Sequence, residues 1–568
     1  MLECCCGREA VAAVHGATNA CAAKTAAAGT LVLPQIVSAF ALQQLGPSSA
    51  ALLLQKLGVD FVGDTFEEVG AEKCGALFQE LGIDFCVELF GASEFWVAEL
   101  FEKLQGQFLT DLFEHCGPGF IADLLRGLGT DFVASLFREL GTSFAADFFK
   151  NLGACYVERL FKGLTYHYCA RLFDQLGSAW TAEAHCIMGF TFCVQLYGAL
   201  GSVFTARLFG TAGCDFTAEV HSAFGAHFTA SLYKGLGVNF VKELFDCLGP
   251  RFCGQLLGDL GEDFDAILFG ELGEDFLAEV FVFLGPTYVA KFFKAMGAQH
   301  CQVFCLLGAS WTSRMHQQMG EEMCKEVYNK LGADYHFLVE LFQRFGFRFT
   351  AELLLMLQAH FCVQIFSALG THVVSLLFRD LGVPFASQLF LHMGDSFVAA
   401  LLAGLGADFC AGLFRTLGRC FVGCLLENLG HRWSAALFTK LGTGFVSDLF
   451  RQFGGIFSVA LLSRHPAFSL QLSAEMGATF ILGVSTTFCC ALHPCACFTQ
   501  VELKRMRKAL FRFTSLCVEP CSGLRETLAI SCNMQHSTWF KLLKDLKCDL
   551  MMWRGRLVGA HGLNVSLF

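Results

Sequence analysis

A twelve-residue repeat is the feature that most limits what this chain can fold into. Its consensus is L-G-x-x-F-x-A-x-L-F-x-x, and stepping by twelve from Gly117 to Gly297 meets glycine at fifteen of sixteen positions, with Thr165 the exception. A second block runs in the same way from Gly370 to Gly454. The repeat accounts for most of the 63 phenylalanines and 58 glycines among 568 residues. Such regularity indicates a stacked array rather than a set of separate globular domains.

The apolar residues of the repeat follow a helical period. We number each repeat from its aromatic residue, called slot 0. At about 100° per residue, slots 0, +1, +4, +5 and +8 share one side of a helix and are apolar. Slots +3, +6 and +7 lie on the other side and are mostly polar, as in Ser135, Arg138 and Glu139. A strand would instead mix valine, glutamate and phenylalanine on one face. The pattern therefore predicts one amphipathic helix in each repeat.

The ends of the repeat carry helix signals too. Glycine follows the last apolar leucine, which predicts a left-handed residue after the helix C-terminus. Asp131 and Ser143 precede their aromatic residues, as helix N-caps do. These limits give a helix of about nine residues and a short loop, and loops this short favour antiparallel neighbours. Because so short a helix is marginal alone in water, it needs neighbours.

We therefore predict an all-α fold: an α-solenoid of tandem 12-residue repeats, each one short helix plus a Gly turn. A β-solenoid with twelve-residue coils is the alternative, because phenylalanine, alanine and leucine at slots 0, +2 and +4 also alternate. The low content of isoleucine and valine weighs against it.

The repeats divide the chain into six segments. They are an Ala/Cys-rich N-terminal segment (1–56), a first repeat block (57–308), an irregular break (309–345), a second repeat block (346–475), an uncharged Cys-rich segment (476–500) and a basic C-terminal tail (501–568). The tail holds 11 lysine and arginine residues against 5 acidic residues. An uncharged run with a basic flank is typical of a membrane segment. Membrane contact through 476–513 is thus an alternative to a tail that packs on the last repeats.

Many of the 29 cysteines occupy slot +1, where valine, threonine or alanine stands in other repeats. There cysteine behaves as a small buried hydrophobic residue. Those that we assign to this slot are Cys86, Cys169, Cys193, Cys253, Cys301, Cys362 and Cys410. Positions so far apart along an array are not a disulfide framework, which favours an intracellular, reducing compartment, the cytoplasm or an organelle.

One dense group of thiols and imidazole is a weak candidate for a metal site. Thiolate and imidazole side chains at this density are ligands for Zn²⁺ or Cu⁺. The group consists of Cys489, Cys490, His493, Cys495 and Cys497. Its spacing is not that of a standard zinc motif, and clustering by chance in a Cys-rich chain is the alternative explanation.

Motifs of catalysis and phosphate binding are missing from the sequence, so we expect neither an enzyme nor a cofactor. His185 and His221 occupy slot +5 and His300 occupies slot 0, where we interpret them as core substitutes with one edge near solvent. The net charge of −11 argues against nucleic acid. We expect a non-enzymatic scaffold that binds a protein or peptide partner along a solenoid surface. A membrane-associated repeat protein and a helical-repeat RNA-binding protein are the alternatives.

Overall fold

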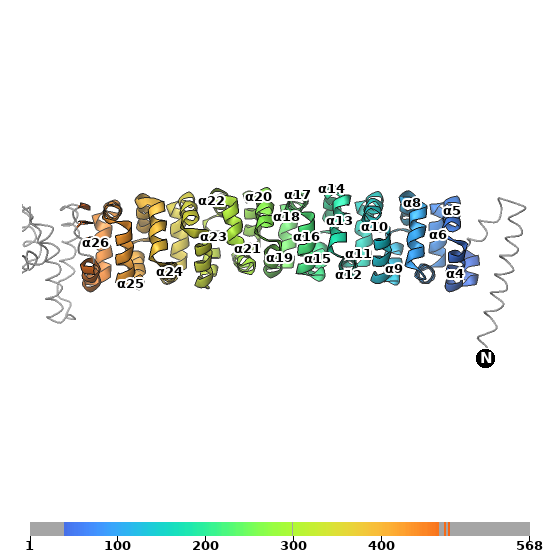
Figure 1. The fold of residues 1–568 in the computed structure, drawn as a ribbon, viewed down its shortest axis with the longest axis horizontal. Coiled ribbons are helices and arrows are strands. Elements are labelled where there is room, and N and C mark those ends of the chain that lie inside the picture. The colour runs from blue at the N-terminus through green and yellow to red at the C-terminus, as the bar shows by residue number, and fades with distance from the viewer. Residues whose placement is uncertain (1–38, 298, 465–467, 469–470, 473–474, 477–568) are drawn as a thin grey trace, which may run out of the picture. The chain divides into compact units, whose positions relative to one another are not determined.

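The computed structural model describes residues 39–297, 299–464, 468, 471–472 and 475–476. Within these ranges the chain forms short helices in tandem and no strand (Figure 1). The predicted all-α solenoid is therefore confirmed, and the β-solenoid alternative is wrong. The chain divides into two compact units, Met1–Leu307 and Gly308–Phe568.

The helices of the first unit follow one another in chain order along the stack (Figure 1). They are α3 (Ala39–Leu45), α4 (Pro47–Leu57), α5 (Val59–Val69), α6 (Ala71–Leu81), α7 (Ile83–Phe90), α8 (Glu94–Cys116), α9 (Pro118–Leu128), α10 (Thr130–Leu152), α11 (Ala154–Leu164), α12 (Tyr166–Leu176), α13 (Ser178–Met188), α14 (Phe190–Leu200), α15 (Ser202–Ala212), α16 (Cys214–Phe224), α17 (Ala226–Leu236), α18 (Val238–Leu248), α19 (Pro250–Leu260), α20 (Glu262–Leu272) and α21 (Glu274–Met296).

The remaining helices are α22 (Gln299–Met319), α23 (Glu321–Gly332), α24 (Tyr335–Leu405), α25 (Ala407–Leu429) and α26 (His431–Arg464). The long ones are not continuous. The backbone of α24, for example, leaves the helical region at Gly346, Gln358, Gly370, Gly382 and Gly394, once every twelve residues. The usual structural unit is thus a helix of eleven residues joined to the next by one residue, longer than the nine that the sequence indicates; α7 and α23 are exceptions.

The connecting glycine explains how one residue suffices. At Gly177 the backbone N–H donates to the Phe173 carbonyl of α12 (2.9 Å), and the Gly177 carbonyl accepts from the Thr181 N–H of α13 (3.0 Å). Both helices therefore keep their hydrogen-bond ladders up to the same residue. Gly177 has φ 92° and ψ 156°, a region that is essentially open to glycine alone.

Two expectations about these ends are wrong. The connector is not in the left-handed helical conformation, since its ψ lies near 155° rather than near 45°. The residue before each helix is the connector itself, and Gly129 provides no side-chain cap ahead of Asp131. A side-chain cap does occur at Ser93, which replaces one of the glycines and whose hydroxyl accepts from the Trp96 N–H.

Consecutive helices are not antiparallel. The axis bends by 102° between α14 and α15 across Gly201. Each helix then packs most extensively on the helices three repeats before and after it, as α14 does on α11 and α17. Three helices thus make one turn of the stack, and equivalent positions on adjacent turns are 36 residues apart.

Polar contacts between turns show this spacing in both units. In the first, Lys162 Nζ donates to the Ala199 carbonyl, 37 residues on (3.1 Å), and the Tyr168 hydroxyl donates to the Leu125 carbonyl, 43 residues back (2.7 Å). In the second, Gln317 Nε2 donates to the Met356 carbonyl, 39 residues on (3.0 Å). The turn of three helices is therefore common to the two units.

The core contains the side chains of the predicted slots and also that of slot +2. In a typical repeat, Val133, Leu136, Phe137 and Leu140 are buried, whereas the slot 0 residue Phe132 is half-buried. Alanine at slot +2 is buried as well, although a single apolar stripe centred on slot +4 does not predict it. The slot +1 cysteines of the prediction are all buried, as expected.

The slot +2 side chain contacts slot +7 of the helix three repeats later. A large side chain in one of these slots is matched by a small residue in the other. A Cβ atom added at Gly235 would lie 2.5 Å from Val194 Cγ2, and one added at Gly404 would lie 2.6 Å from Val363 Cγ2. Where slot +2 holds valine in these pairs, slot +7 holds glycine. Slot +7 is therefore part of the contact between turns and does not simply face solvent.

Candidate functional site

The slot +5 side chains form a column inside the first unit that consists mostly of aromatic rings, with Leu125 and Leu257 as aliphatic members. We call it the aromatic column. Rings twelve residues apart touch edge to face, with centroids 6.0 Å apart for Phe161 and Phe173 and 5.3 Å apart for Phe78 and Phe90. Such edge-to-face pairs are a favoured arrangement of aromatic side chains. The aromatic column lies in the apolar interior of the stack, between the three helices of each turn.

Two histidine–tyrosine pairs interrupt this column on adjacent turns. His185 and Tyr197 take consecutive slot +5 positions, and so do His221 and Tyr233. The Tyr197 hydroxyl lies 2.9 Å from His185 Nε2, and the Tyr233 hydroxyl lies 3.1 Å from His221 Nε2. The four side chains are between 2% and 5% exposed. The expected solvent-facing edge of the two imidazoles is therefore absent, because tyrosine covers it.

The backbone fixes the tautomer of each imidazole. His185 Nδ1 lies 2.7 Å from the Thr181 carbonyl, and His221 Nδ1 lies 2.7 Å from the Thr217 carbonyl. A carbonyl only accepts, so Nδ1 carries the proton of the neutral ring and Nε2 accepts from the phenol. Burial lowers the pKa of both imidazoles and raises the pKa of the Tyr197 and Tyr233 phenols. The neutral pair is therefore the stable form near pH 7.

The second unit repeats the arrangement. His316 Nδ1 lies 2.8 Å from the Thr312 carbonyl, and His316 Nε2 lies 3.1 Å from the Tyr328 hydroxyl. Burial lowers the pKa of His316 too. Three copies with one geometry indicate a defined motif: threonine at slot +1, histidine at slot +5 and tyrosine at the next slot +5. The sequence alone could have indicated this motif, because each slot +5 histidine is followed by tyrosine twelve residues later.

Slot +1 offers a backbone acceptor to its side chain. The Cys410 and Cys362 thiols lie 3.5 Å from the carbonyls of Leu402 and Leu354, and Cys324 lies 3.4 Å from that of His316, each eight residues earlier. Burial raises the pKa of all three thiols to about 12. These cysteines are therefore neutral, inert core residues and not nucleophiles.

Asp265 is the exception at slot +1. It is 0% exposed, and neither carboxylate oxygen has a hydrogen-bond partner among the described residues. Burial raises its pKa to about 8, so the side chain is protonated at neutral pH. The carbonyl eight residues earlier is that of Leu257. A protonated carboxyl group has an O–H donor, as threonine has an O–H and cysteine an S–H at slot +1 of other repeats.

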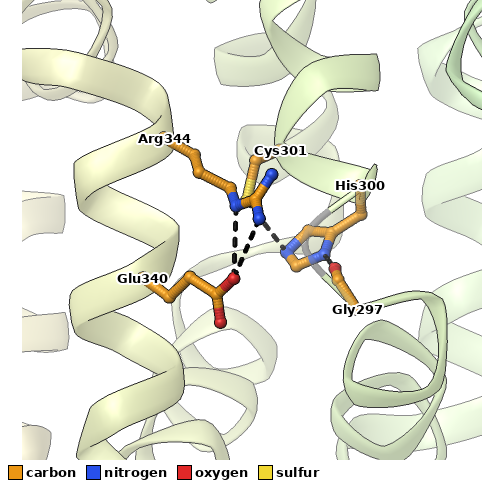
Figure 2. A network of polar contacts seen from close by, with 5 residues as sticks. All are labelled: Gly297, His300, Cys301, Glu340 and Arg344. Atoms are coloured by element: carbon orange, nitrogen blue, oxygen red, sulfur yellow. Dashed lines mark hydrogen bonds and ion pairs between the residues drawn. The ribbon is translucent and has the colours of Figure 1, made fainter.

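His300 also lies in the core, 3% exposed. Its Nδ1 atom contacts the Gly297 carbonyl (Figure 2). Burial lowers the pKa of His300 to about 4. In the second unit, Arg344 forms an ion pair with Glu340 on the surface of α24, at 3.1 Å (Figure 2). Such exposed pairs between residues four apart on a helix contribute little to stability.

The outward slots of the first unit form rows, because every third helix lies on the same face. One row, at slot +3, is acidic over four turns: Asp111 on α8, Asp147 on α10, Glu183 on α13 and Glu219 on α16. We call it the acidic row. Asp147, Glu183 and Glu219 are exposed and Asp111 is half-buried. The Ser178 hydroxyl donates to Glu219 (2.7 Å) and so fixes the last carboxylate of the row.

Among the described residues, the three helices α21, α24 and α25 are long and apolar enough to cross a membrane by length and composition, and the bent pair α14 and α15 would add a fourth. Each of the three is broken within its length, at Gly285 in α21 and at Gly418 in α25. An eleven-residue helix is about 16 Å long, and the hydrocarbon core of a bilayer is about 30 Å thick. These helices are therefore successive repeats rather than straight spans.

The predicted metal ligands Cys489, Cys490, His493, Cys495 and Cys497 lie outside the described residues, as does the proposed membrane segment beyond residue 476. Within the part of the chain that the structure describes, no group of three or more histidine, cysteine or acidic side chains is placed to hold a metal ion. Comparison of the chain with known protein families, with curated proteins and with solved structures finds no match.

Proposed function

We propose that this chain is a non-enzymatic scaffold that binds a protein or peptide partner along the outward surface of its helical stack. The acidic row is the observation that carries the proposal. The inward slots repeat the same few residue types from turn to turn, whereas the outward slots vary and are aligned in rows. Aligned, variable outward positions are what repeat proteins use to recognise partners.

The spacing of the row suggests the chemistry of the partner. Helices packed side by side lie about 8–10 Å apart, so the four carboxylates recur at about that interval. A peptide in the polyproline II conformation advances about 3.1 Å per residue with three residues per turn, so every third side chain lies on the same face and recurs at about 9 Å. A peptide with lysine or arginine at every third position would pair with Asp111, Asp147, Glu183 and Glu219 in turn. The next two positions of the row, Gln255 and Lys291, end the acidic run.

A direct test is titration of the full chain with a fluorescent peptide that carries lysine at every third position. The variant D147N/E183Q/E219Q removes three charges without changing side-chain shape. Exposed ion pairs contribute about 0.5 kcal/mol each, so we expect about a tenfold loss of affinity. Glu139→Gln is the matched control, because Glu139 is an exposed acid of α10 on another face.

The proposal fails if the triple variant binds the peptide as well as the unmodified chain, or if Glu139→Gln weakens binding equally. Single-stranded RNA and anionic vesicles serve as competing ligands in the same assay. Binding to either that exceeds binding to the peptide would favour the RNA-binding or membrane-associated alternative.

A further inference from the structure

We propose that the two histidine–tyrosine pairs of the first unit form an acid-sensitive site, at which a fall in pH opens helices α13 to α17 while turns with only phenylalanine and leucine at slot +5 stay closed. The proposal is independent of any partner. His185 and His221 are 36 residues apart and so occupy adjacent turns of the same column.

The two imidazoles share one neighbour. The Phe224 ring lies 5.7 Å from the His185 ring and 5.8 Å from the His221 ring, measured between centroids. A single phenyl ring therefore separates the two sites. Two imidazolium charges so close together in an apolar core would repel one another with little screening. Protonation of one histidine thus opposes protonation of the other while the turn stays closed.

The surroundings offer no compensating negative charge. Phe173 of α12 and Phe209 of α15 complete the ring contacts of His185 and His221. The titratable groups that act on the pairs, within the described part of the chain, are the two imidazoles, the Tyr197 and Tyr233 phenols and the buried thiols of Cys169, Cys193 and Cys253. Helices α10 and α19 also pack against α13 and α16, but no charged group of theirs acts on either imidazole.

Protonation also disrupts one of the two hydrogen bonds of the motif. In the neutral state Nδ1–H donates to a threonine carbonyl and Nε2 accepts from the tyrosine O–H. An added proton on Nε2 converts that acceptor into a donor, so the phenol can no longer donate to it and the phenol O–H loses its acceptor in the buried core. Opening the turn exposes both imidazoles to water, where they bind protons with an ordinary pKa of about 6.5.

The direction and size of the effect follow from linkage. The folded-state pKa of each histidine is lowered, so the stability that depends on the neutral form is present above about pH 6.5 and is lost as the pH falls. Opening takes up two protons, one at each imidazole. Between pH 7.5 and pH 5.5 the opening equilibrium constant rises about tenfold for each proton and about 100-fold in all.

Hydrogen–deuterium exchange on the full chain tests this, with protection factors corrected for the intrinsic pH dependence of exchange. We expect the opening constant of amides in 178–236 to rise about 100-fold between pH 7.5 and pH 5.5. Amides in 106–164 serve as the internal control. The column there contains only Phe113, Leu125, Phe137, Phe149 and Phe161, and the control should change little.

Variants separate the motif from general acid instability. H185F/Y197F/H221F/Y233F places phenylalanine at every slot +5 position of 178–236 and should abolish the pH dependence of that segment. H221F/Y233F retains one histidine and should reduce the rise to about tenfold, which provides a test even if the fourfold variant does not fold. The proposal is overturned if exchange in 178–236 shows no excess over 106–164 at pH 5.5, or if the excess survives in the folded variants.

Discussion

The contact between Val194 and Gly235 allows a sharp test of how the turns pack. The two residues are 41 positions apart, on α14 and α17, and a Cβ atom added at Gly235 would lie 2.5 Å from Val194 Cγ2. Valine in a helix has one strongly preferred rotamer, so it cannot turn away. The variant Gly235→Ala therefore overpacks the contact between adjacent turns.

The expected magnitude combines two opposing terms. Overpacking a well-packed contact costs about 1–3 kcal/mol, whereas replacing glycine by alanine inside a helix gains about 1 kcal/mol. Gly235→Ala alone should therefore be neutral or destabilise the chain by up to about 2 kcal/mol. In V194A/G235A the added methyl group has room, so the double-mutant cycle should show a favourable coupling of about 1–3 kcal/mol.

Urea denaturation followed by circular dichroism measures these differences. Gly198→Ala is the matched control, because a Cβ atom there would lie 3.9 Å from Leu236 Cδ2, an ordinary contact. That variant should gain up to about 1 kcal/mol from helix propensity alone. A coupling energy near zero between Val194 and Gly235 would show that α14 and α17 do not pack as described.

Three further predictions concern single slots. Thr165 has φ 74° and ψ 152°, a strained backbone conformation for threonine, so Thr165→Gly should raise the free energy of unfolding by about 1 kcal/mol. Gly177→Thr should lower the free energy of unfolding by a similar amount, and urea denaturation measures both changes. Asp265 keeps its proton to about pH 8 when folded, so stability should fall by about 1.4 kcal/mol per pH unit from pH 4 to 8. Thermal melts of Asp265→Val across this range should lack that slope, and an unchanged slope would refute the assignment. Tyr197→Phe leaves His185 Nε2 without its donor and should cost about 1–3 kcal/mol, most of which H185F/Y197F should recover.

The sequence pattern predicts the helical class well because the pattern is local. The angular positions of slots 0 to +8 depend only on the helical period, and they place Val133, Leu136 and Phe137 in the core correctly. Helix length and direction were predicted less well. Loop statistics describe connectors of several residues, whereas Gly177 belongs to the hydrogen-bond ladders of both its helices. A connector of one residue bends the chain instead of reversing it.

The hydrogen-bonded histidine–tyrosine motif was not predicted from the sequence, for a different reason. The motif joins residues in successive repeats, so examining His185 within its own repeat places one edge of the ring in solvent. Comparing slot +5 between neighbouring repeats would have revealed that Tyr197, Tyr233 and Tyr328 each follow a histidine. The pairing of Val194 with Gly235 is likewise invisible at a period of twelve. It appears only when positions about 41 residues apart are compared, which requires knowledge of the three-helix turn.

The three-helix turn is the central claim, and spin-label distances within the first unit test it most directly. Arg159, Arg171, Glu183 and Gln195 are exposed slot +3 residues on four consecutive helices, α11 to α14. Dipolar EPR on pairs that combine residue 159 with each of the others compares separations of 12, 24 and 36 residues. We predict that 159 and 195 are the closest pair, since α11 and α14 pack side by side with axes about 8–10 Å apart. A shortest distance between 159 and 183 would instead indicate antiparallel hairpins of two helices and contradict the account.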